Sequence, residues 1–198
     1  MMTKVSKILN EGGAVVLPTE TVYGLFAKAF DKKAVENVYK LKKRPLEKAL
    51  NLNISSYQEM LDYSKNQPAY LKTLYDHFLP GPLTIILEAN DKVPKWLNSG
   101  KKTVGFRVPK HPKTLQLIKE HGPLIGPSAN ISGKESGVYF DNIMVSFKGR
   151  VSGIKDDAFL TGQDSTILDL TDTKVRILRQ GAITKNDILS YLPEMTFE

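Results

Sequence analysis

The first polar groups that could do chemistry in this chain follow an apolar run. Thr19, Glu20 and Thr21 come directly after residues 14–17, and Gly24 follows them. Hydroxyls and a carboxylate at the exit of a buried strand are a common way to present polar groups to a small ligand. The alternative is an ordinary turn whose threonines cap the next element, and taken alone this segment favours the turn.

Four basic side chains are candidates for binding anions. Lys42 and Arg44 stand at the end of a predicted helix, where cations either complement the negative helix end or grip a phosphate. Arg107 lies inside an apolar strand-like run, so its charge must be paired or must face a polar cleft. Arg179 ends another such run and allows the same two interpretations.

A loop rich in small and hydroxyl residues is a further candidate for binding phosphate. Residues 126–137 read Gly-Pro-Ser-Ala-Asn-Ile-Ser-Gly-Lys-Glu-Ser-Gly, and such loops bring backbone amides and hydroxyls against anions. The loop does not match a Walker motif, because Glu135 stands where Ser or Thr should follow the lysine. The chain also contains no GxGxxG fingerprint, so a nucleotide site would need a different construction.

Composition predicts a folded protein with an anionic partner. The chain has 198 residues, of which 41% are hydrophobic and 25% are charged, which is enough for one well-buried core. Lys and Arg number 28 against 21 Asp and Glu, a formal net charge of +7. This excess favours a nucleotide, tRNA or another nucleic acid, and a plain basic surface is the alternative.

Several function classes are excluded or disfavoured. The chain has no cysteine, which excludes thiol nucleophiles, disulfides and thiolate metal sites. The three histidines, His77, His111 and His121, lack metal-ligand spacing, so we expect no metal site built from protein ligands. The amino terminus resembles a short amphipathic helix and not a secretion signal, and no apolar stretch reaches membrane-spanning length. We therefore expect a cytoplasmic protein with no membrane partner.

Helical and strand-like patterns alternate along the chain. Helical periodicity predicts helices before Gly12, over 34–41, over 56–79 with an interruption at Pro68, over 112–120, over 140–147 and from the cap Thr184 to Leu192. Apolar runs predict strands at 14–17, 50–54, 83–87, 103–108, 124–125, 166–170 and 175–178, the last two paired. We expect a single α/β domain with a twisted, mixed parallel and antiparallel sheet flanked by helices.

Taken in order, several segments resemble the signature of one family. They are residues 18–25, 42–45, 80–84, 107–112, 127–133, 165–166 and 177–179. Together they look like the YrdC-like L-threonylcarbamoyladenylate synthases, including the paired KxR and SxN elements, over residues 13–181. Each segment is weak by itself, and the ordered set is strong. The resemblance implies a YrdC-like fold with a basic concave ligand-binding surface, in the short form with one catalytic domain over residues 1–198.

The resemblance also implies an activity. Members of this family make threonylcarbamoyl-AMP and pyrophosphate from L-threonine, bicarbonate or CO2, and ATP, with Mg2+ accompanying the ATP. The product supplies the threonylcarbamoyl group on the adenosine beside the anticodon of ANN-decoding tRNAs. tRNA and a downstream threonylcarbamoyl transferase are therefore the implied partners. No carboxylate cluster in the sequence indicates protein ligands for the Mg2+.

Site residues follow from the positions of the motifs. The resemblance assigns ATP to Lys42, Arg44, Ser128, Asn130, Ser136 and Arg179, with Lys42 and Arg44 catalytic, and L-threonine to Thr21, Arg107 and Ser165. Lys48 and Asn53 stand where the family often has asparagine and histidine, and we assign them to ATP and L-threonine respectively. Phe26 replaces a usual glycine, and Gln180 replaces a usual proline.

Two other function classes compete with the synthase. A positively charged concave surface of this size could belong to a non-catalytic module that binds tRNA or double-stranded RNA. The chain lacks a run of aromatics interleaved with basic residues that would stack bases, which argues mildly against this class. A related enzyme that transfers a carbamoyl group from carbamoyl phosphate is the third hypothesis, although such enzymes are normally longer chains.

Overall fold

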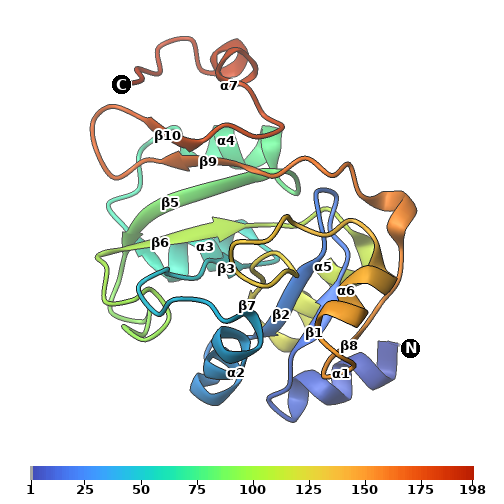
Figure 1. The fold of residues 1–198 in the computed structure, drawn as a ribbon. Helices are drawn as coiled ribbons and strands as arrows, with labels where there is room; N and C mark the ends of the chain where they lie inside the picture. Colours follow the sequence, from blue (N-terminus) through green and yellow to red (C-terminus); the bar gives the residue numbers. More distant parts are fainter. Residues whose placement is uncertain (1) are drawn as a thin grey trace.

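All strands of the protein belong to one mixed sheet. The computed structural model describes residues 2–198. The strands are β1 (Val15–Leu17), β2 (Gly24–Lys28), β3 (Leu52–Asn53), β4 (Ser64–Lys65), β5 (Leu83–Ala89), β6 (Thr103–Arg107), β7 (Leu124–Ile125), β8 (Ser152–Gly153), β9 (Thr166–Asp169) and β10 (Arg176–Arg179). Their order is β10-β9-β5-β6-β3-β7-β2-β1-β8, with β4 beside β5 (Figure 1). Parallel pairs (β1–β8, β3–β6, β5–β9) stand among antiparallel ones, which confirms the predicted mixed sheet.

Helices flank this sheet. They are α1 (Met2–Asn10), α2 (Lys32–Lys42), α3 (Tyr57–Asp62), α4 (Leu71–Phe78), α5 (Pro112–His121), α6 (Phe140–Ser146) and α7 (Lys185–Tyr191), with a 3-10 turn, η1, at Asp157–Phe159. Thr184 caps α7 as predicted, because its hydroxyl accepts from Asp187 N and the Asp187 carboxylate accepts from Thr184 N. No helix within residues 2–198 combines the length and the apolar character needed to cross a bilayer.

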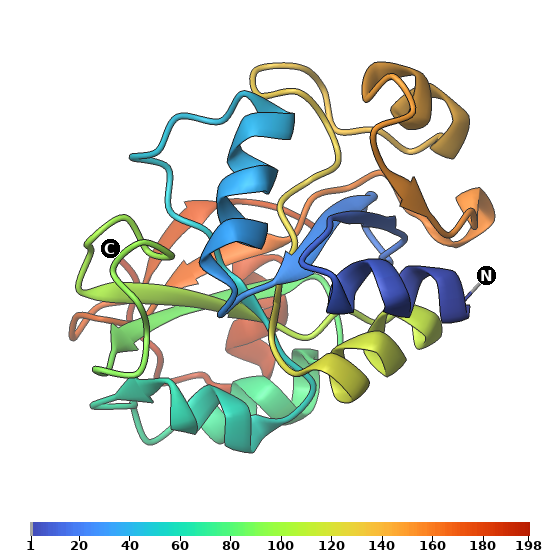
Figure 2. The same cartoon turned by 90° about the horizontal axis from the view of Figure 1, so that it is seen from below.

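Strand β2 separates two hydrophobic layers by simple alternation. Leu25 and Ala27 face the layer that contains the apolar side of α2, and Phe26 points the other way, toward α1 and α5. Figure 2 shows α2 on one side of the sheet and α5 on the other. A Cβ added at Gly24 or Gly126 would come within 2.4 or 2.5 Å of the Phe26 ring. The ring therefore requires glycine at both positions.

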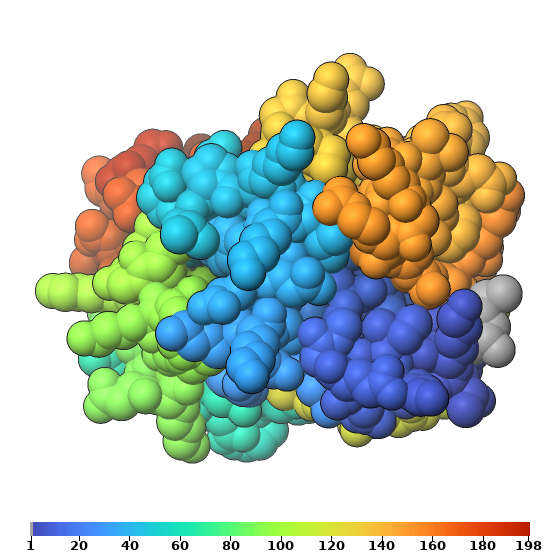
Figure 3. Space-filling model, turned by 60° about the horizontal axis from the view of Figure 1, so that its bottom comes forward, coloured from blue at the N-terminus to red at the C-terminus, as the bar shows by residue number. Residues whose placement is uncertain are grey.

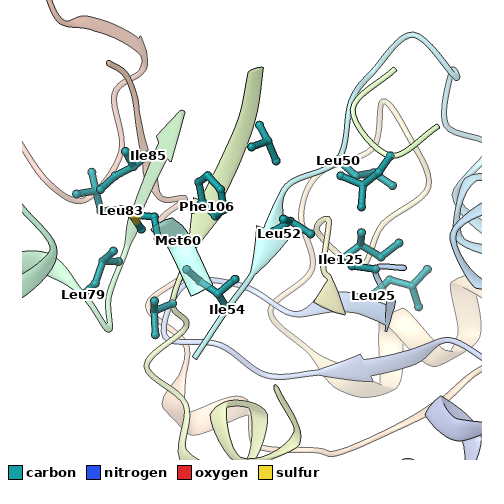
Figure 4. Packing of buried hydrophobic residues seen from close by; sticks show 14 of the residues in the cluster. Leu25, Leu50, Leu52, Ile54, Met60, Leu79, Leu83, Ile85, Phe106 and Ile125 are labelled. Carbon is teal, nitrogen blue, oxygen red and sulfur yellow. The ribbon is translucent and has the colours of Figure 1, made fainter. Parts of the chain in front are cut away.

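The centre of the sheet is a short strand that holds two neighbours. Leu52 of β3 pairs in parallel with Phe106 of β6 and antiparallel with Ile125 of β7. All three side chains are fully buried, and Figure 4 shows Leu52 between the other two. Strand β3 therefore joins the half of the sheet that contains β6 to the half that contains β7. This brings the segments that adjoin these strands to the same edge of the sheet.

The sequence prediction of secondary structure failed in three places. The helix expected over 56–79 is wrong between α3 and α4, where Ser64–Lys65 form β4 and pair with Ala89 and Glu88 of β5. Strand β2 was missed, because its glycine was interpreted as part of a turn, and the two-residue strand β8 was missed as well. All three errors concern pairing with distant segments: β4 pairs with β5, β2 pairs with β7, and β8 pairs with β1. Local periodicity does not contain that information.

The central position of Leu52 leads to a stability prediction. Leu52→Ala is expected to lower the free energy of unfolding by about 2–5 kcal/mol, because it opens a cavity in a fully packed region. The control is Leu178→Ala on β10, where the side chain is 55% exposed and the change is expected to stay within about 0.5 kcal/mol. Urea denaturation measures both. Equal losses would contradict the central role of β3.

Candidate active site

An open pocket of ≈ 210 Å³ lies at the edge where these strands end. Its walls come from within residues 19–24, 44–53, 126–128 and 164–167, with Thr84, Arg107 and Arg179 between them. These segments are far apart in the sequence, and the sheet order brings them together. Most of the segments that supplied candidate residues therefore do meet in one hollow.

Arg44 supplies the first cation of the pocket. Lys43 caps the carboxyl end of helix α2, and its left-handed backbone (φ 50°, ψ 42°) turns the chain so that Arg44 reaches the pocket. The Arg44 guanidinium donates to the carbonyls of Lys48 (3.0 Å) and Ala49 (2.9 Å). Burial lowers the pKa of Arg44 from its ordinary value. Neutral carbonyls orient this cation, and no carboxylate of residues 2–198 lies within ion-pair distance of it.

Lys42 lies behind the pocket wall rather than on it. Its side chain is only 1% exposed, and Nζ donates to Ser128 O, to Asn130 O (2.5 Å) and to Asn130 Oδ1 (3.3 Å). Ser132 N donates in turn to Lys42 O at 2.8 Å. The lysine therefore fastens the loop to the end of α2. In Figure 3 this loop, in yellow, projects between the blue-to-cyan segment around the end of α2 and the orange segment near residues 150–155.

The predicted KxR element (Lys42 and Arg44) and SxN element (Ser128 and Asn130) thus lie together, and each supplies one residue to the pocket surface and one to its support. Arg44 and Ser128 line the pocket, whereas Lys42 and Asn130 hold its wall. The Asn130 amide accepts from Ser128 Oγ and donates to Lys134 O at 2.6 Å. Asn130 acts from behind the wall, by orienting the loop that carries Ser128.

Arg107 supplies the second cation, and both interpretations of its buried charge hold. Its Nη2 donates to Glu20 Oε1 and to Thr21 Oγ1, each at 2.7 Å, and the guanidinium also lines the pocket. The Thr21 hydroxyl lies 2.9 Å from that of Thr19, which faces the pocket. Thr21 is buried and touches Arg107, so it is placed to orient the arginine.

Arg179 supplies the third cation of the pocket. Its Nε donates to Ser165 O and its Nη2 to Ser165 Oγ, both at 2.9 Å, and Asp164 Oδ2 lies 3.5 Å from its Nη1. Parallel pairing of β5 with β9 places Thr84 next to this group, with its hydroxyl 3.1 Å from Ser165 Oγ. Ser165, which was predicted to bind L-threonine, therefore contacts Arg179, which was predicted to bind ATP.

The remaining predicted residues differ in position. Asn53 lines the pocket, and its amide makes no hydrogen bond to another described residue. Lys48 is exposed and contributes only its carbonyl, which accepts from Arg44 and Tyr39. Ser136 is absent from the pocket walls. Of these three predicted residues, Asn53 therefore lies in the pocket, and Lys48 and Ser136 lie outside its walls.

Sequence reasoning assigned no ligand to several polar residues that line or support the pocket. Thr19, Tyr23, Asn51, Thr84 and Asp164 line it, and Glu20 pairs with Arg107 behind it. The Tyr23 hydroxyl donates to Asp157 Oδ1 at 2.7 Å, and burial raises its pKa. Glu20 stands between Thr19 and Thr21 in the quoted motif, and a buried arginine needs an acid, so the signal for Glu20 was present.

No group of three or more His, Cys, Asp or Glu side chains within residues 2–198 is arranged to hold a metal ion. Asp164 is the one carboxylate among the described residues that line the pocket. Apart from this carboxylate, the site therefore offers hydroxyls, the amides of Asn51 and Asn53, and three guanidinium groups. Such groups bind anions and polar ligands.

The fold and the pocket define a YrdC-like α/β domain with an arginine-lined ligand site. Residues 7–181 match the model of the Sua5–YciO–YrdC family, which is described as "Telomere recombination". The chain belongs to this family, as its motifs predicted.

Named relatives agree with this membership. The chain is 36% identical over 189 residues to the threonylcarbamoyl-AMP synthase of Pyrococcus abyssi, covering 94% of this chain and 56% of that one. It is 38% identical over 190 residues to the Bacillus subtilis protein of the same name, covering 94% and 55%. The crystal structure of P. abyssi Sua5 complexed with L-threonine superposes with a TM-score of 0.93 at 34% identity, covering 100% and 58%. The chain therefore spans about half the length of these relatives.

The buried Lys42 leads to a prediction about pH. Burial, with a smaller contribution from Arg44, lowers the pKa of Lys42 from 10.5 to about 7. Between these two values the unfolded chain holds a proton that the folded protein has lost, so stability rises with pH across this window. The free energy of unfolding of the natural chain is expected to rise from about pH 7 to about pH 9 relative to that of Lys42→Met.

Urea denaturation at several pH values measures this difference, in which the contributions of all other groups cancel. Lys40→Met, a change of an exposed lysine on the same helix, is the control and should follow the natural chain. Parallel curves for the natural chain and Lys42→Met would show that the lysine keeps its ordinary pKa.

Proposed function

We propose that this chain makes threonylcarbamoyl-AMP and pyrophosphate from L-threonine, CO2 or bicarbonate, and ATP. The observation that carries the proposal is one pocket whose walls contain Arg44 and Ser128 together with Arg107 and Asn53. A triphosphate and an amino-acid carboxylate are both anions, and each needs its own cation. The kinship with the P. abyssi and B. subtilis synthases supports the same assignment.

The reaction needs two bonds to form. The threonine amine attacks CO2, forms a C–N bond and loses a proton, which gives a carbamate. A carbamate oxygen then attacks the α-phosphorus of ATP, and the bond to the bridging oxygen breaks, so pyrophosphate leaves with the electron pair. Positioning and charge neutralisation do most of this work, so a site of arginines, hydroxyls and an amide is sufficient.

We assign the side chains by their place in the pocket. Arg107, oriented by Thr21, would bind the threonine carboxylate, and Asn53 and Ser165 would bind its other polar groups. Arg44, Ser128 and Arg179 would bind the phosphates. Lys42 and Asn130 would act indirectly through the loop that they hold. Lys48 and Ser136 would reach the nucleotide only if their segments move toward the pocket.

Mg2+ is proposed to arrive with ATP. It binds readily through phosphate oxygens and waters with one or two carboxylates, and Asp164 offers one carboxylate at the pocket wall. Asp164 is 41% exposed, so it can leave Arg179 without a burial penalty. The residues present therefore fit an ion that the triphosphate holds for the most part, and that ion would neutralise phosphate charge.

Pyrophosphate release tests the reaction directly. With ATP, Mg2+ and bicarbonate, we expect release only when L-threonine is present, and we expect the nucleotide product to carry the threonylcarbamoyl group. Mass spectrometry of the product is the second readout. Release that does not depend on L-threonine, or no release at all, would contradict the proposal. Turnover of carbamoyl phosphate would favour the carbamoyl-transfer class.

Arg44→Ala tests the phosphate side. It is expected to weaken ATP binding by about 1.5–3 kcal/mol, which is about tenfold to a hundredfold, because one charged contact to phosphate is lost. Lys33→Ala is the control, since Lys33 is an exposed cation on α2 away from the pocket. Calorimetric titration with ATP measures both. Equal losses would indicate diffuse surface charge instead of a specific contact.

Two partners beyond the small molecules stay predictions, namely the ANN-decoding tRNA and a downstream transferase. The cytoplasmic location also stays a prediction. The non-catalytic RNA-binding module is the alternative, and tight, salt-resistant binding of tRNA without nucleotide would favour it. No contact among the described residues favours that class over the synthase.

A further inference from the structure

The three arginines of the pocket differ in their negative partners. Arg44 is held by two backbone carbonyls and has no acid beside it among residues 2–198. Arg107 forms an ion pair with Glu20 at 2.7 Å, and Arg179 lies 3.5 Å from Asp164. One pocket therefore contains three guanidinium groups with three different electrostatic settings.

Burial decides how strongly each acid acts. The side chains of Arg107 and Glu20 are 14% and 11% exposed, whereas those of Arg179 and Asp164 are 42% and 41% exposed. Water screens the exposed pair, while the buried pair interacts in a medium of lower dielectric constant. Glu20 therefore cancels much of the positive field of Arg107, and Asp164 cancels less of that of Arg179.

Arg44 has the reverse arrangement. Two backbone carbonyls hold its guanidinium, and the buried Lys42 amine nearby in the chain also has carbonyl and amide oxygens as partners and not carboxylates. Arg44 therefore keeps its positive charge uncompensated, whereas Glu20 compensates that of Arg107. A polyanion is therefore attracted more strongly to Arg44 than to Arg107.

Glu20 is fixed in its place. Its Oε2 accepts from Lys110 N at 2.8 Å while its Oε1 accepts from Arg107, so both oxygens are engaged. In Arg107 the Nε group is buried without a partner, and no hydrogen bond to a described residue is made by Nη1. Arg107 therefore still offers the N–H groups of Nη1 to a ligand in the pocket, although Glu20 compensates its charge.

We propose that Glu20 is a specificity-determining residue that reserves the Arg107 side for a small carboxylate ligand and keeps polyphosphates at the Arg44 side. A monoanion gains hydrogen bonds from Arg107 and meets little net repulsion. A polyphosphate brought there meets the fixed charge of Glu20. The identity of the two ligands as L-threonine and ATP rests on the proposed function. The sorting of anions by charge does not.

The test uses inorganic tripolyphosphate as the probe, titrated calorimetrically. The natural chain is expected to bind it at one site, and Arg44→Ala is expected to weaken that site at least about tenfold. Glu20→Gln removes the negative charge with little change of volume, and we expect it to create a second tripolyphosphate site. Arg107→Met in the Glu20→Gln background is expected to abolish that second site.

A matched control separates charge sorting from general damage. Asp169 pairs with Arg176 at 2.6 Å, is 9% exposed and stands outside the pocket walls, so Asp169→Asn makes the same kind of change elsewhere. It should keep one site. Glu20→Asp, which retains the charge, should also keep one site, and thermal melting of each variant shows that it is folded.

A measurement on the natural chain covers the case in which Glu20→Gln does not fold. Saturating tripolyphosphate should change the Kd of L-threonine by less than about twofold, because the two anions occupy different sides. The proposal is overturned if tripolyphosphate competes with L-threonine in the natural chain, or if folded Glu20→Gln binds a single equivalent. Failure of the synthase proposal appears elsewhere, as a lack of threonine-dependent pyrophosphate release.

Discussion

The burial of the Lys42 amine is the constraint on which the wall of the pocket depends. A buried amine without a carboxylate needs hydrogen-bond acceptors, and here the carbonyls of Ser128 and Asn130 provide them. These carbonyls can meet the amine only if the loop turns back over the end of α2. The same turn leaves Ser128 on the pocket surface beside Arg44. One interaction thus explains why the KxR and SxN elements occur together.

Arg107 carries a second charge that is largely buried, and a carboxylate and hydroxyl groups compensate it. Arg107 lies in a strand whose neighbours are apolar, and Glu20 and two threonine hydroxyls satisfy one of its nitrogens. A cation prepared in this way is rigid, and its remaining N–H groups need no reorganisation to meet a ligand. Preorganised donors of this kind stabilise negative charge on a bound ligand. The kinship with threonylcarbamoyl-AMP synthases agrees with such a site.

Much of the fold could be predicted from the sequence. The helical period of α5 and the cap at Thr184 are local signals, and the apolar runs of β5 and β6 are long enough to be recognised without tertiary information. Strands β2 and β4 could not be predicted in this way. Their residues become strands because distant segments present free backbone groups, and no local pattern encodes those partners.

The sequence by itself determined the chemical inventory: hydroxyls, guanidinium groups and an amide in motifs whose order indicates the family, and no thiol. Only the tertiary structure decided which way each group faces. Lys42 points behind the wall, Lys48 points outward, and Glu20 points at Arg107. The reason is that the direction of a side chain depends on how its segment pairs with partners far along the chain, and that pairing exists only in the folded protein.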